Sequence, residues 1–479
     1  MKRPSYSSLL VVIFLVSLPF VNPWVRGDGV QYYAYLRSLL VEHHLQFEND
    51  WRHANPGLRA YGVDAEGRIS PDAYTDTGLL DNPHPVGASL LWAPFLIPVH
   101  AVLVVLHRWD VGTPADGFSR PYLIALALAT ALYGFTGLLI SYHLARHYVN
   151  EGWAFVATLG IWFATSLPVY MYFDPAYSHA LSVFVVAVFL WYWRRTRAER
   201  TVAQWIALGC ISGLMLDVYY PNIAILLVPL LESLRRYGRA LRSPTGRSSL
   251  RPLFLGNLSF AAATLVAFLP NLITRQMIYG HPLTFGFWGI APDWAHPALW
   301  QPLFSSNHGW LTWTPVVIPS LVGLAVFRRY DSELAVSALA SVAAFYYIVA
   351  CFPNWHGVSS FGNRIFLSLV PFLVVGLAAS LQEVAQWCKR ASSAWVLNGS
   401  AVGALVVWNL AFIFQWGTGL IPHVGAISWK EMARNQFTAV PARLGHSLQA
   451  YFGERGKMIQ SIEEQDIQRR QEEEKRKEM

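Results

Sequence analysis

Long apolar runs alternate with short polar segments along most of the chain. Many of these runs have the length that crosses the hydrocarbon core of a bilayer, about 17 to 25 residues. After an N-terminal run, they cover approximately 88–107, 121–145, 153–172, 178–193, 203–219, 221–234, 253–274, 311–327, 334–351, 364–382 and 394–416.

The N-terminal segment combines a basic head, Lys2-Arg3, with an apolar run, as a secretory signal does. No small-x-small cleavage site follows the run. We therefore expect the segment to remain as the first membrane helix.

Basic clusters between the runs predict the orientation of the helices, because Lys and Arg in short loops mark the cytoplasmic side. From Arg146 onward, two apolar runs separate each successive pair of clusters, but three runs separate Arg146 from the N-terminal cluster. One run should therefore not cross. We expect 88–107, broken by Pro94 and Pro98, to be a juxtamembrane or re-entrant helix on the outer face. The clusters are Lys2-Arg3, Arg146, Arg194 to Arg200, Arg235 to Arg251, Arg328-Arg329 and Lys389-Arg390.

This topology predicts about eleven spans and one long outer loop, residues 26–120. We expect residues 1–416 to form the transmembrane domain and 417–479 to form an outer C-terminal extension. The segment 454–479 is dense in charge and has little apolar surface to bury, which predicts a helical or partly disordered arm. A protein partner could bind through it.

Composition supports the membrane class. Hydrophobic residues make up 54% of the chain and charged residues 14%, whereas charged residues account for about a quarter of a soluble domain. The formal net charge is +7, but the basic residues lie in short clusters between apolar runs, which is typical of helix orientation and not of nucleic-acid binding. We expect a multi-pass protein of the cell membrane, surrounded by membrane lipids.

The long outer loop begins with an acidic residue. Asp28 lies between Gly27 and Gly29, and Tyr32 follows it at helical spacing on an amphipathic surface helix. An acid in this position can cap the helix and interact with the positive end of its dipole. It can also act as a general base. The pattern leaves both interpretations open.

Other ionisable residues lie near the expected outer side. Arg364 precedes an apolar run, where it could snorkel to the headgroups or clamp a phosphate through two parallel charge-assisted bonds. His356 lies in the same segment. Arg275 ends the run 253–274 on the outer side, against the orientation rule. Asp217 lies near the end of a span, where acids usually face a polar cavity or a partner.

The motifs of cofactor and metal sites are missing from the sequence. The outer histidines form no HExxH and no Cys/His cluster, so no metal site is predicted, although the pattern leaves room for a divalent metal. No GxxxxGK[ST] loop and no strand-GxGxxG-helix unit is present, so we predict no cofactor. These histidines are His84, His179, His281, His308 and His356.

The chain resembles the GT-C superfamily of integral membrane glycosyltransferases. It shares with them one span, a long outer loop that begins with an acid, many further spans and an outer arginine. The chain is similar in particular to the branch with the protein O-mannosyltransferases and the lipid A aminoarabinose transferase. The resemblance reaches to about residue 380. It is carried by GDGVQYY around Asp28, PAYSHALS at 175–182, MIYGHPLTFGFW at 277–288, SSNHGWLTWTPVVIPSLVGL at 305–324 and NWHGVSSFGNRIFLSLVPFLVVGLA at 354–378.

The resemblance implies an all-α, GT-C-like fold. It also implies transfer of a sugar from a polyprenyl-phosphate-linked donor to a lipid, glycan or protein acceptor on the outer, extracytoplasmic face. Asp28 would be the base, and Arg364 would anchor the phosphate. The remaining candidates for the substrate site are His356, Tyr32, Arg275, Asp217 and His84.

Two positions depart from the family pattern. Many relatives carry a second acid after the first, and Gly29 stands there in this chain. A Lys-Pro-Pro turn is replaced by the segment Asn82 to Pro85, which removes one expected phosphate contact. The missing Lys puts the usual donor in question.

Two alternatives remain. The chain could be a structural or accessory membrane subunit that keeps the fold without activity, as the charged tail and the missing second acid suggest. It could also transport a lipid-linked glycan, which requires access from both sides and usually internal repeats. An outer cavity that holds both Asp28 and Arg364 would favour the enzyme, whereas separated or packed residues would favour the accessory subunit.

Overall fold

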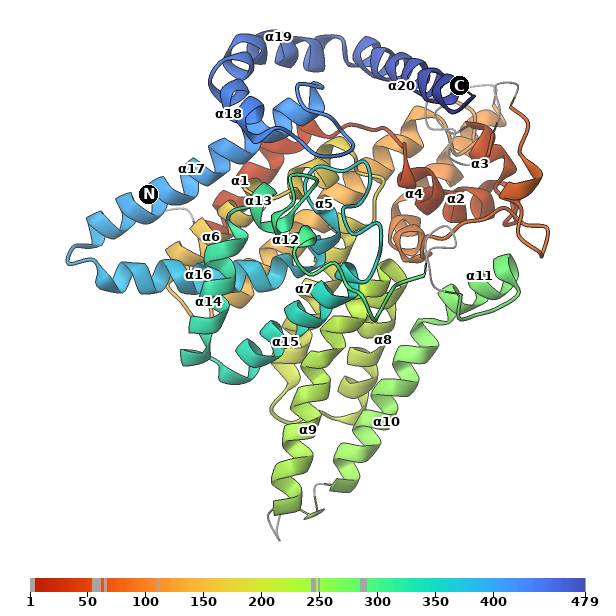
Figure 1. Ribbon diagram of the computed structural model, residues 1–479. Helices are drawn as coiled ribbons and strands as arrows, with labels where there is room; N and C mark the ends of the chain where they lie inside the picture. The colour runs from red at the N-terminus through yellow and green to blue at the C-terminus, as the bar shows by residue number, and fades with distance from the viewer. Residues whose placement is uncertain are drawn as a thin grey trace.

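The computed structural model describes residues 5–53, 62–63, 67–109, 112–242, 247–248, 250–284 and 291–478. In these ranges every regular element is a helix, and strand pairing is limited to isolated bridges. The all-α class expected from the sequence is confirmed (Figure 1). The end of the motif at 277–288 lies outside the described residues.

The α-helices of the described residues follow one another along the chain from Tyr6 to Glu478. They are α1 (Tyr6–Ser17), α2 (Asp28–Arg37), α3 (Glu48–His53), α4 (Gly87–His107), α5 (Arg120–Ala145), α6 (Glu151–Phe163), α7 (His179–Thr196), α8 (Val202–Val218), α9 (Leu227–Arg242), α10 (Leu250–Ala267), α11 (Leu269–Tyr279), α12 (Gln301–Phe304), α13 (Trp310–Trp313), α14 (Val317–Val326), α15 (Ser332–Ala350), α16 (Val370–Trp387), α17 (Ala391–Gly417), α18 (Trp429–Phe437), α19 (Ala439–Gly453) and α20 (Arg455–Glu478).

Within the described residues, six helical segments are long and apolar enough to cross a membrane. They are α4, α5, α10, α15, α17 and the segment Arg364–Trp387, which joins the 3₁₀ turn η9 (Arg364–Leu369) to α16. Shorter apolar helices cover Tyr6–Phe20 and Val202–Val218. The multi-pass class is therefore supported, while the expected number of eleven spans is not confirmed.

The prolines of α4 do not break it. The helix is continuous from Gly87 to His107, with Pro94 and Pro98 inside it, which corrects the expectation of a broken segment. Membrane helices tolerate internal proline because neighbouring groups and small local adjustments satisfy the freed backbone carbonyls. By length and composition α4 is one of the six candidate spans. Its non-crossing placement is thus not supported by any break in the helix.

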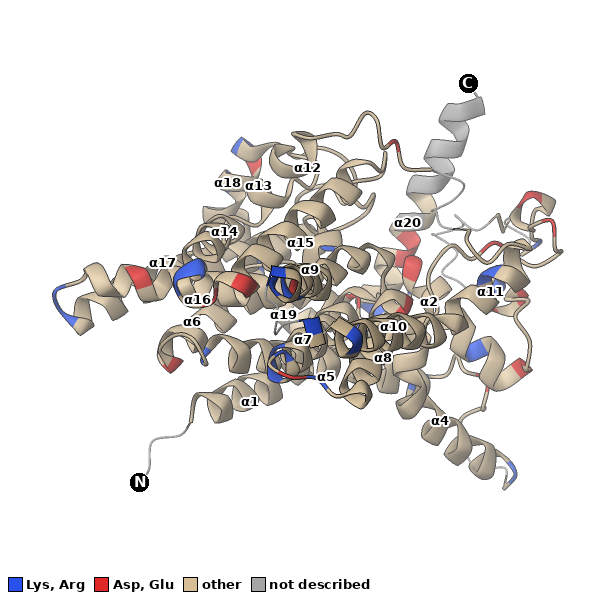
Figure 2. Cartoon of the chain, turned by 90° about the horizontal axis from the view of Figure 1, so that it is seen from below, with Lys and Arg blue, Asp and Glu red and all other residues tan. Residues whose placement is uncertain are grey.

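Polar bonds join the basic turns of the bundle to one another. Arg197 forms an ion pair with Asp331 at 2.6 Å, and the Tyr148 hydroxyl donates to the same carboxylate. The buried pair of Arg200 and Glu232 connects the α7–α8 turn to α9 at 2.8 Å. Further pairs of this network are Arg235–Glu333 and Arg329–Glu383. These pairs join the basic segments around Arg197, Arg235 and Arg329 at one end of the bundle, and Figure 2 looks onto the end of α9, where Lys and Arg gather.

The same turns contain the signals that begin the helices. The Asn150 side chain caps α6, and Asp331 caps α15 through the backbone N–H of Leu334. Thr201 and Gln204 form a capping box at the start of α8. These side chains satisfy backbone N–H groups that a helix start leaves unpaired.

Glycines allow the closest helix crossings in the bundle. A Cβ at Gly376 of α16 would clash with the Ser320 carbonyl of α14, and a Cβ at Gly323 would clash with the Gly376 carbonyl. Gly209 and Gly213 of α8 similarly allow the backbone of α10 to approach closely. Small residues at such crossings let backbones approach and gain van der Waals contact, which drives helix association in lipid.

The opposite end of the bundle holds α2, α3 and the rest of the first loop, which has a small apolar core of its own. In Figure 1 these elements and α11 lie at the right, away from the α9–α10 and α16–α17 turns, while α18 to α20 cross the top. α7 shows the separation of the two ends: it begins at His179 and reaches the basic turn at Thr196. Its 18 residues span about 27 Å at 1.5 Å per residue, close to the thickness of the hydrocarbon core.

Candidate active site

Asp28 is the first residue of α2, and the chain before it turns sharply. Gly27 has φ +56°, and a Cβ at this position would clash with the Tyr177 hydroxyl. Glycine is favoured here because it adopts positive φ without steric cost. The turn leaves the Asp28 side chain 32% exposed and directed into a cavity.

Arg364 begins η9 and meets Asp28 from the other half of the chain. Its Nη2 donates to Asp28 Oδ2 at 2.5 Å, and its Nη1 donates to the Ser359 carbonyl at 2.9 Å. The guanidinium lies 4.7 Å from the centre of the Tyr177 ring. Only 10% of the Arg364 side chain is exposed. The arginine is thus held in the site and does not extend to the headgroups.

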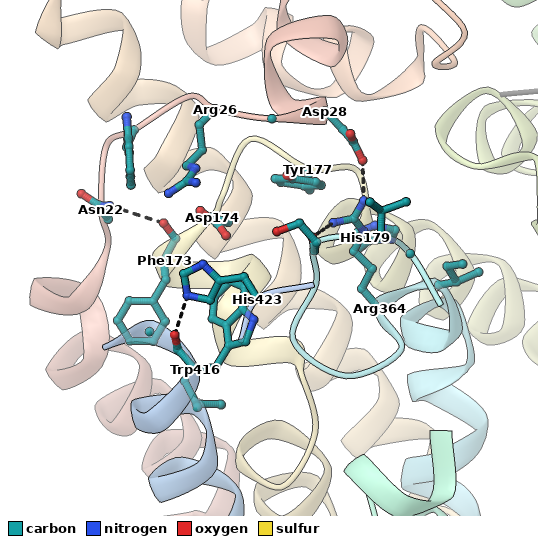
Figure 3. A pocket seen from close by; sticks show the side chains of 18 of the residues that line it. Asn22, Arg26, Asp28, Phe173, Asp174, Tyr177, His179, Arg364, Trp416 and His423 are labelled. Carbon is teal, nitrogen blue, oxygen red and sulfur yellow. Dashed lines mark hydrogen bonds and ion pairs between the residues drawn. The ribbon is translucent and has the colours of Figure 1, made fainter. Parts of the chain in front are cut away.

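The cavity that holds this pair has a volume of about 1590 Å³, larger than typical small-molecule sites of about 300–1,000 Å³. Figure 3 shows Asp28 and Arg364 joined across it, with Tyr177 and His179 beside them. Aromatic side chains form the wall around the pair. They are Tyr32, His84, Tyr177, His179, Tyr219 and Tyr220.

His84 and Tyr32 border the carboxylate. His84 Nε2 lies 4.0 Å from Asp28 Oδ1, and its ring lies 4.3 Å from the ring of Tyr32. Burial lowers the pKa of His84 to about 4, although Asp28 opposes the shift. His84 is therefore neutral at physiological pH and can donate or accept a hydrogen bond beside the carboxylate.

Arg275 holds the turn that presents His84. Its guanidinium donates to the carbonyls of Asn82 and Pro83 at 2.9 and 2.8 Å and to the carbonyl of His84, while its Nε donates to the Tyr220 hydroxyl. Arg275 is 1% exposed and does not line the cavity. Arg275, which the sequence analysis expected on the outer side, thus fixes the turn from Asn82 to Pro85 that stands in place of the Lys-Pro-Pro turn.

Two further sequence candidates lie away from the cavity wall. His356 accepts a hydrogen bond from the Val358 N–H, and its carbonyl accepts one from the His308 ring. Asp217 is completely buried in α8, where Gly87 of α4 packs against its backbone. Neither residue lines the cavity, although their neighbours Gly357 and Leu216 do.

A second polar group lies on the other side of Tyr177. Figure 3 shows Asp174 between Arg26 and His423, and all three line the cavity. Burial raises the pKa of Asp174, while Arg26, Arg364 and His423 oppose the shift. The sequence analysis did not select these residues. Asp174 directly precedes the PAYSHALS segment, which was the available signal, whereas His423 lies beyond the resemblance and offered none.

One edge of the cavity is apolar. Ile223 and Trp294 line it and are 56% and 53% exposed. Leu216, Phe268 and Ile348 continue this wall inward. Large exposed apolar side chains at a cavity edge mark contact with lipid or with an apolar ligand.

Among the described residues, no group of three or more His, Cys, Asp or Glu side chains could hold a metal ion. The site brings together an acid, Asp28, a cation, Arg364, and a neutral imidazole, His84, in one partly enclosed space. These groups can accept a proton and stabilise an anion at the same time.

No protein-family model matches the chain, and no curated protein sequence matches it. Among solved structures, the chain is similar to ArnT from Cupriavidus metallidurans bound to undecaprenyl phosphate. The TM-score is 0.45 at 13% sequence identity, over 91% of this chain and 73% of that chain. The likeness is distant, and it assigns no substrate or residue role to this chain.

Proposed function

We propose that the protein is a membrane glycosyltransferase that moves a sugar from a polyprenyl-phosphate-linked donor to an acceptor at the outer face. The observation that carries the proposal is the meeting of Asp28 and Arg364 in one large cavity. The two residues come from motifs 336 positions apart. Their meeting in a cavity supports an enzyme over an accessory subunit, for which helix packing around them would be sufficient.

The two charges match the needs of glycosyl transfer. Asp28 takes the proton of an acceptor hydroxyl while the acceptor oxygen bonds to the anomeric carbon of the sugar. The bond from that carbon to the phosphate oxygen breaks, and its electron pair leaves with the phosphate. Arg364 stabilises this departing anion, because guanidinium pairs with phosphate through parallel charge-assisted bonds.

The paired state of the two residues suits this sequence of events. In the described structure Arg364 is bonded to Asp28. A donor phosphate would compete for the same guanidinium and leave the carboxylate available to the acceptor. Tyr177 and Tyr219 line the space beside the pair and can present ring faces and hydroxyls to a sugar.

The apolar edge of the cavity suits the lipid part of such a donor. Ile223 and Trp294 would contact the polyprenyl chain where it leaves the cavity for the bilayer. A lipid-borne donor needs no nucleotide-binding motif, in agreement with the sequence.

Packing next to the cavity disfavours the transporter alternative. The buried hydroxyls of Ser182 and Ser368 are 2.7 Å apart, and the Asn222 amide donates to Ser182 at 2.9 Å. These bonds join α7, η9 and the 3₁₀ segment η6 (Tyr220–Leu226) next to the cavity. A route to the basic end would have to break them.

Lipids that co-purify with the protein provide the direct test. Mass spectrometry of the wild-type protein should detect a polyprenyl phosphate, and Arg364→Ala should reduce its amount. Arg443→Ala, an exposed arginine of α19, is the matched control and should retain the lipid. Equal amounts of ordinary phospholipid and no polyprenyl phosphate in all three proteins would contradict the proposal.

A further inference from the structure

The chain ends in three helices, α18 to α20, that lie beyond the family resemblance. Figure 1 shows α19 and α20 crossing the top of the molecule from α18 toward the first loop. The described side chains of α19 and α20 contribute to the cavity lining from His446 to Gln465. The tail is therefore part of the wall of the candidate active site.

Two residues at the junction of α19 and α20 attach this arm to the N-terminal segment. The Tyr451 hydroxyl donates to the Phe20 carbonyl at 2.7 Å. The Arg455 guanidinium donates to the carbonyls of Pro19 and Val21, each at 2.8 Å. Arg455 also lies over the Tyr451 ring, 4.2 Å from its centre. We call these two residues, Tyr451 and Arg455, the latch.

Aromatic contacts surround the latch. The Tyr451 ring lies 5.9 Å from the ring of Phe173, edge to face, and 6.4 Å from the ring of Phe20. Phe173 directly precedes Asp174, and both line the cavity. The latch therefore fixes the arm beside the second polar group of the site.

Beyond the latch, α20 lines the cavity with apolar side chains and, beside them, with Lys457, Ser461 and Gln465. Met458 lies three residues after Arg455, and Ile462 lies four residues after Met458, which places them on one helix face. Both are partly buried and line the cavity, together with Ile459. The positions between and after them are mainly charged or amide residues. The composition of the tail alone indicates a solvated arm, but the helix gives it one face suited to covering an apolar hollow.

We propose that α19 and α20 form a cover that shields the outer mouth of the cavity from bulk water and that the latch holds this cover in place. The consequence for catalysis rests on the proposed function. Water is a competing nucleophile at an activated sugar, and a closed site excludes it. The cover thereby favours transfer over hydrolysis and determines which acceptors reach Asp28. The shielding itself requires no assumption about the reaction.

Thiol labelling measures the shielding directly. Asn22 lines the cavity next to the latch and is 5% exposed, so Asn22→Cys reports access under the arm. The native thiols Cys210, Cys351 and Cys388 are replaced by alanine. A charged, membrane-impermeant maleimide should label Asn22→Cys slowly in the otherwise native protein. Arg455→Ala should increase the labelling rate by about tenfold or more, because it removes the two charged hydrogen bonds that join the arm to the Pro19 and Val21 carbonyls.

Two further variants keep the test sharp. Tyr451→Phe removes only the hydroxyl that reaches Phe20 and should increase the rate less than Arg455→Ala does. Arg443→Ala removes an exposed arginine of the same arm and should leave the rate unchanged. Unfolding temperatures of all variants show whether the fold is retained, and Tyr451→Phe carries the test if Arg455→Ala does not fold.

The outcomes separate this proposal from the proposed function. Equal labelling rates with and without the latch, or fast labelling in the native arm, would overturn the cover. If labelling follows the latch while Asp28→Asn leaves the glycosyl-transfer assay unchanged, the cover stands and the catalytic proposal fails.

Discussion

Arg364 has a carboxylate partner in the protein itself, and this pairing determines what single substitutions should do. A cation at headgroup level would tolerate any residue with a long stem and a charged head. A cation held by Asp28, the Ser359 carbonyl and the Tyr177 ring depends on its planar shape. The candidate site therefore distinguishes substitutions that retain charge from those that retain geometry.

Asp28→Asn should abolish transfer while leaving the fold intact. The amide is nearly isosteric but cannot take a proton, and loss of a general base lowers rates by about 10²–10⁴-fold. A transfer assay with a polyprenyl-phosphate-linked sugar, together with the unfolding temperature, measures both effects. Full activity in this variant would show that Asp28 is only a structural residue at the start of α2.

Arg364→Lys should weaken the use of donor even though charge is kept. An ammonium cannot reproduce the planar two-bond contact with phosphate. The dependence of rate on donor concentration, compared for wild type, Lys and Ala variants, tests this expectation. The same dependence in all three proteins would exclude Arg364 from the phosphate site.

The buried, neutral His84 makes stability depend on pH. Burial lowers its pKa from 6.5 to about 4 in the folded protein, so the unfolded chain binds more protons between these values. Stability is then fully present above pH 6.5 and is lost as the pH falls toward 4. The unfolding temperature should decrease over this window, and His84→Asn should flatten that decrease. An unchanged slope in the variant would assign the pH dependence to other groups.

The sequence predicted Asp28 and Arg364 because each stands in a recognisable position, at a loop start and before an apolar run. It could not predict the task of Arg275, because the partners are backbone carbonyls of Asn82 to His84. Backbone carbonyls are present at every residue, so the side-chain pattern does not reveal which of them accept a bond. These acceptors also lie about 190 positions from Arg275 in the chain. Asp174 and His423 join the site for a similar reason, through folding rather than through any local motif.

Helices pack in this protein through contacts that sequence periodicity does not reveal. Apolar runs predicted where helices lie, but not that α4 continues through two prolines or that the charged tail forms an apolar face over a cavity. Both outcomes depend on the surroundings: lipid and neighbouring helices for α4, and the hollow of the site for α20. The composition of a segment reflects its average environment, whereas each face of a helix can have a different environment.

Gly376→Ala should separate α14 from α16. Its Cβ would clash with the Ser320 carbonyl, and overpacking of this kind destabilises by about 1–3 kcal/mol. Gly399→Ala on α17 is the matched control, since a Cβ there meets nothing within 4 Å. The unfolding temperature should fall for Gly376→Ala and stay level or rise slightly for Gly399→Ala. A similar response of both variants would contradict the crossing.

The molecule as a whole has two chemically different ends. Ion pairs join the basic turns at one end, from Arg197–Asp331 to Arg329–Glu383. The cavity and its cover lie at the other end. Asp28 and Arg364 meet there although more than 300 residues separate them in the chain. The orientation rule predicts that the basic end faces the cytoplasm.

Labelling of single cysteines in cells tests this orientation. Ser392→Cys lies exposed near the α16–α17 turn, and Ala442→Cys lies exposed on α19, away from the cavity lining. An impermeant reagent added outside should label Ala442→Cys and reach Ser392→Cys only after the membrane is opened. Labelling of both positions from the same side would overturn the predicted topology.

The ion-paired basic end has a mechanical consequence. Ion pairs between α7, α8, α9, α15 and α16 at this end restrain the helices relative to one another there and leave the other end less restrained. We therefore expect motion to be greatest at the far edge, where the proposed lipid donor would enter between helices. Amide exchange should accordingly be slow at the ion-paired end and faster around the cavity, and a lipid substrate should slow it there.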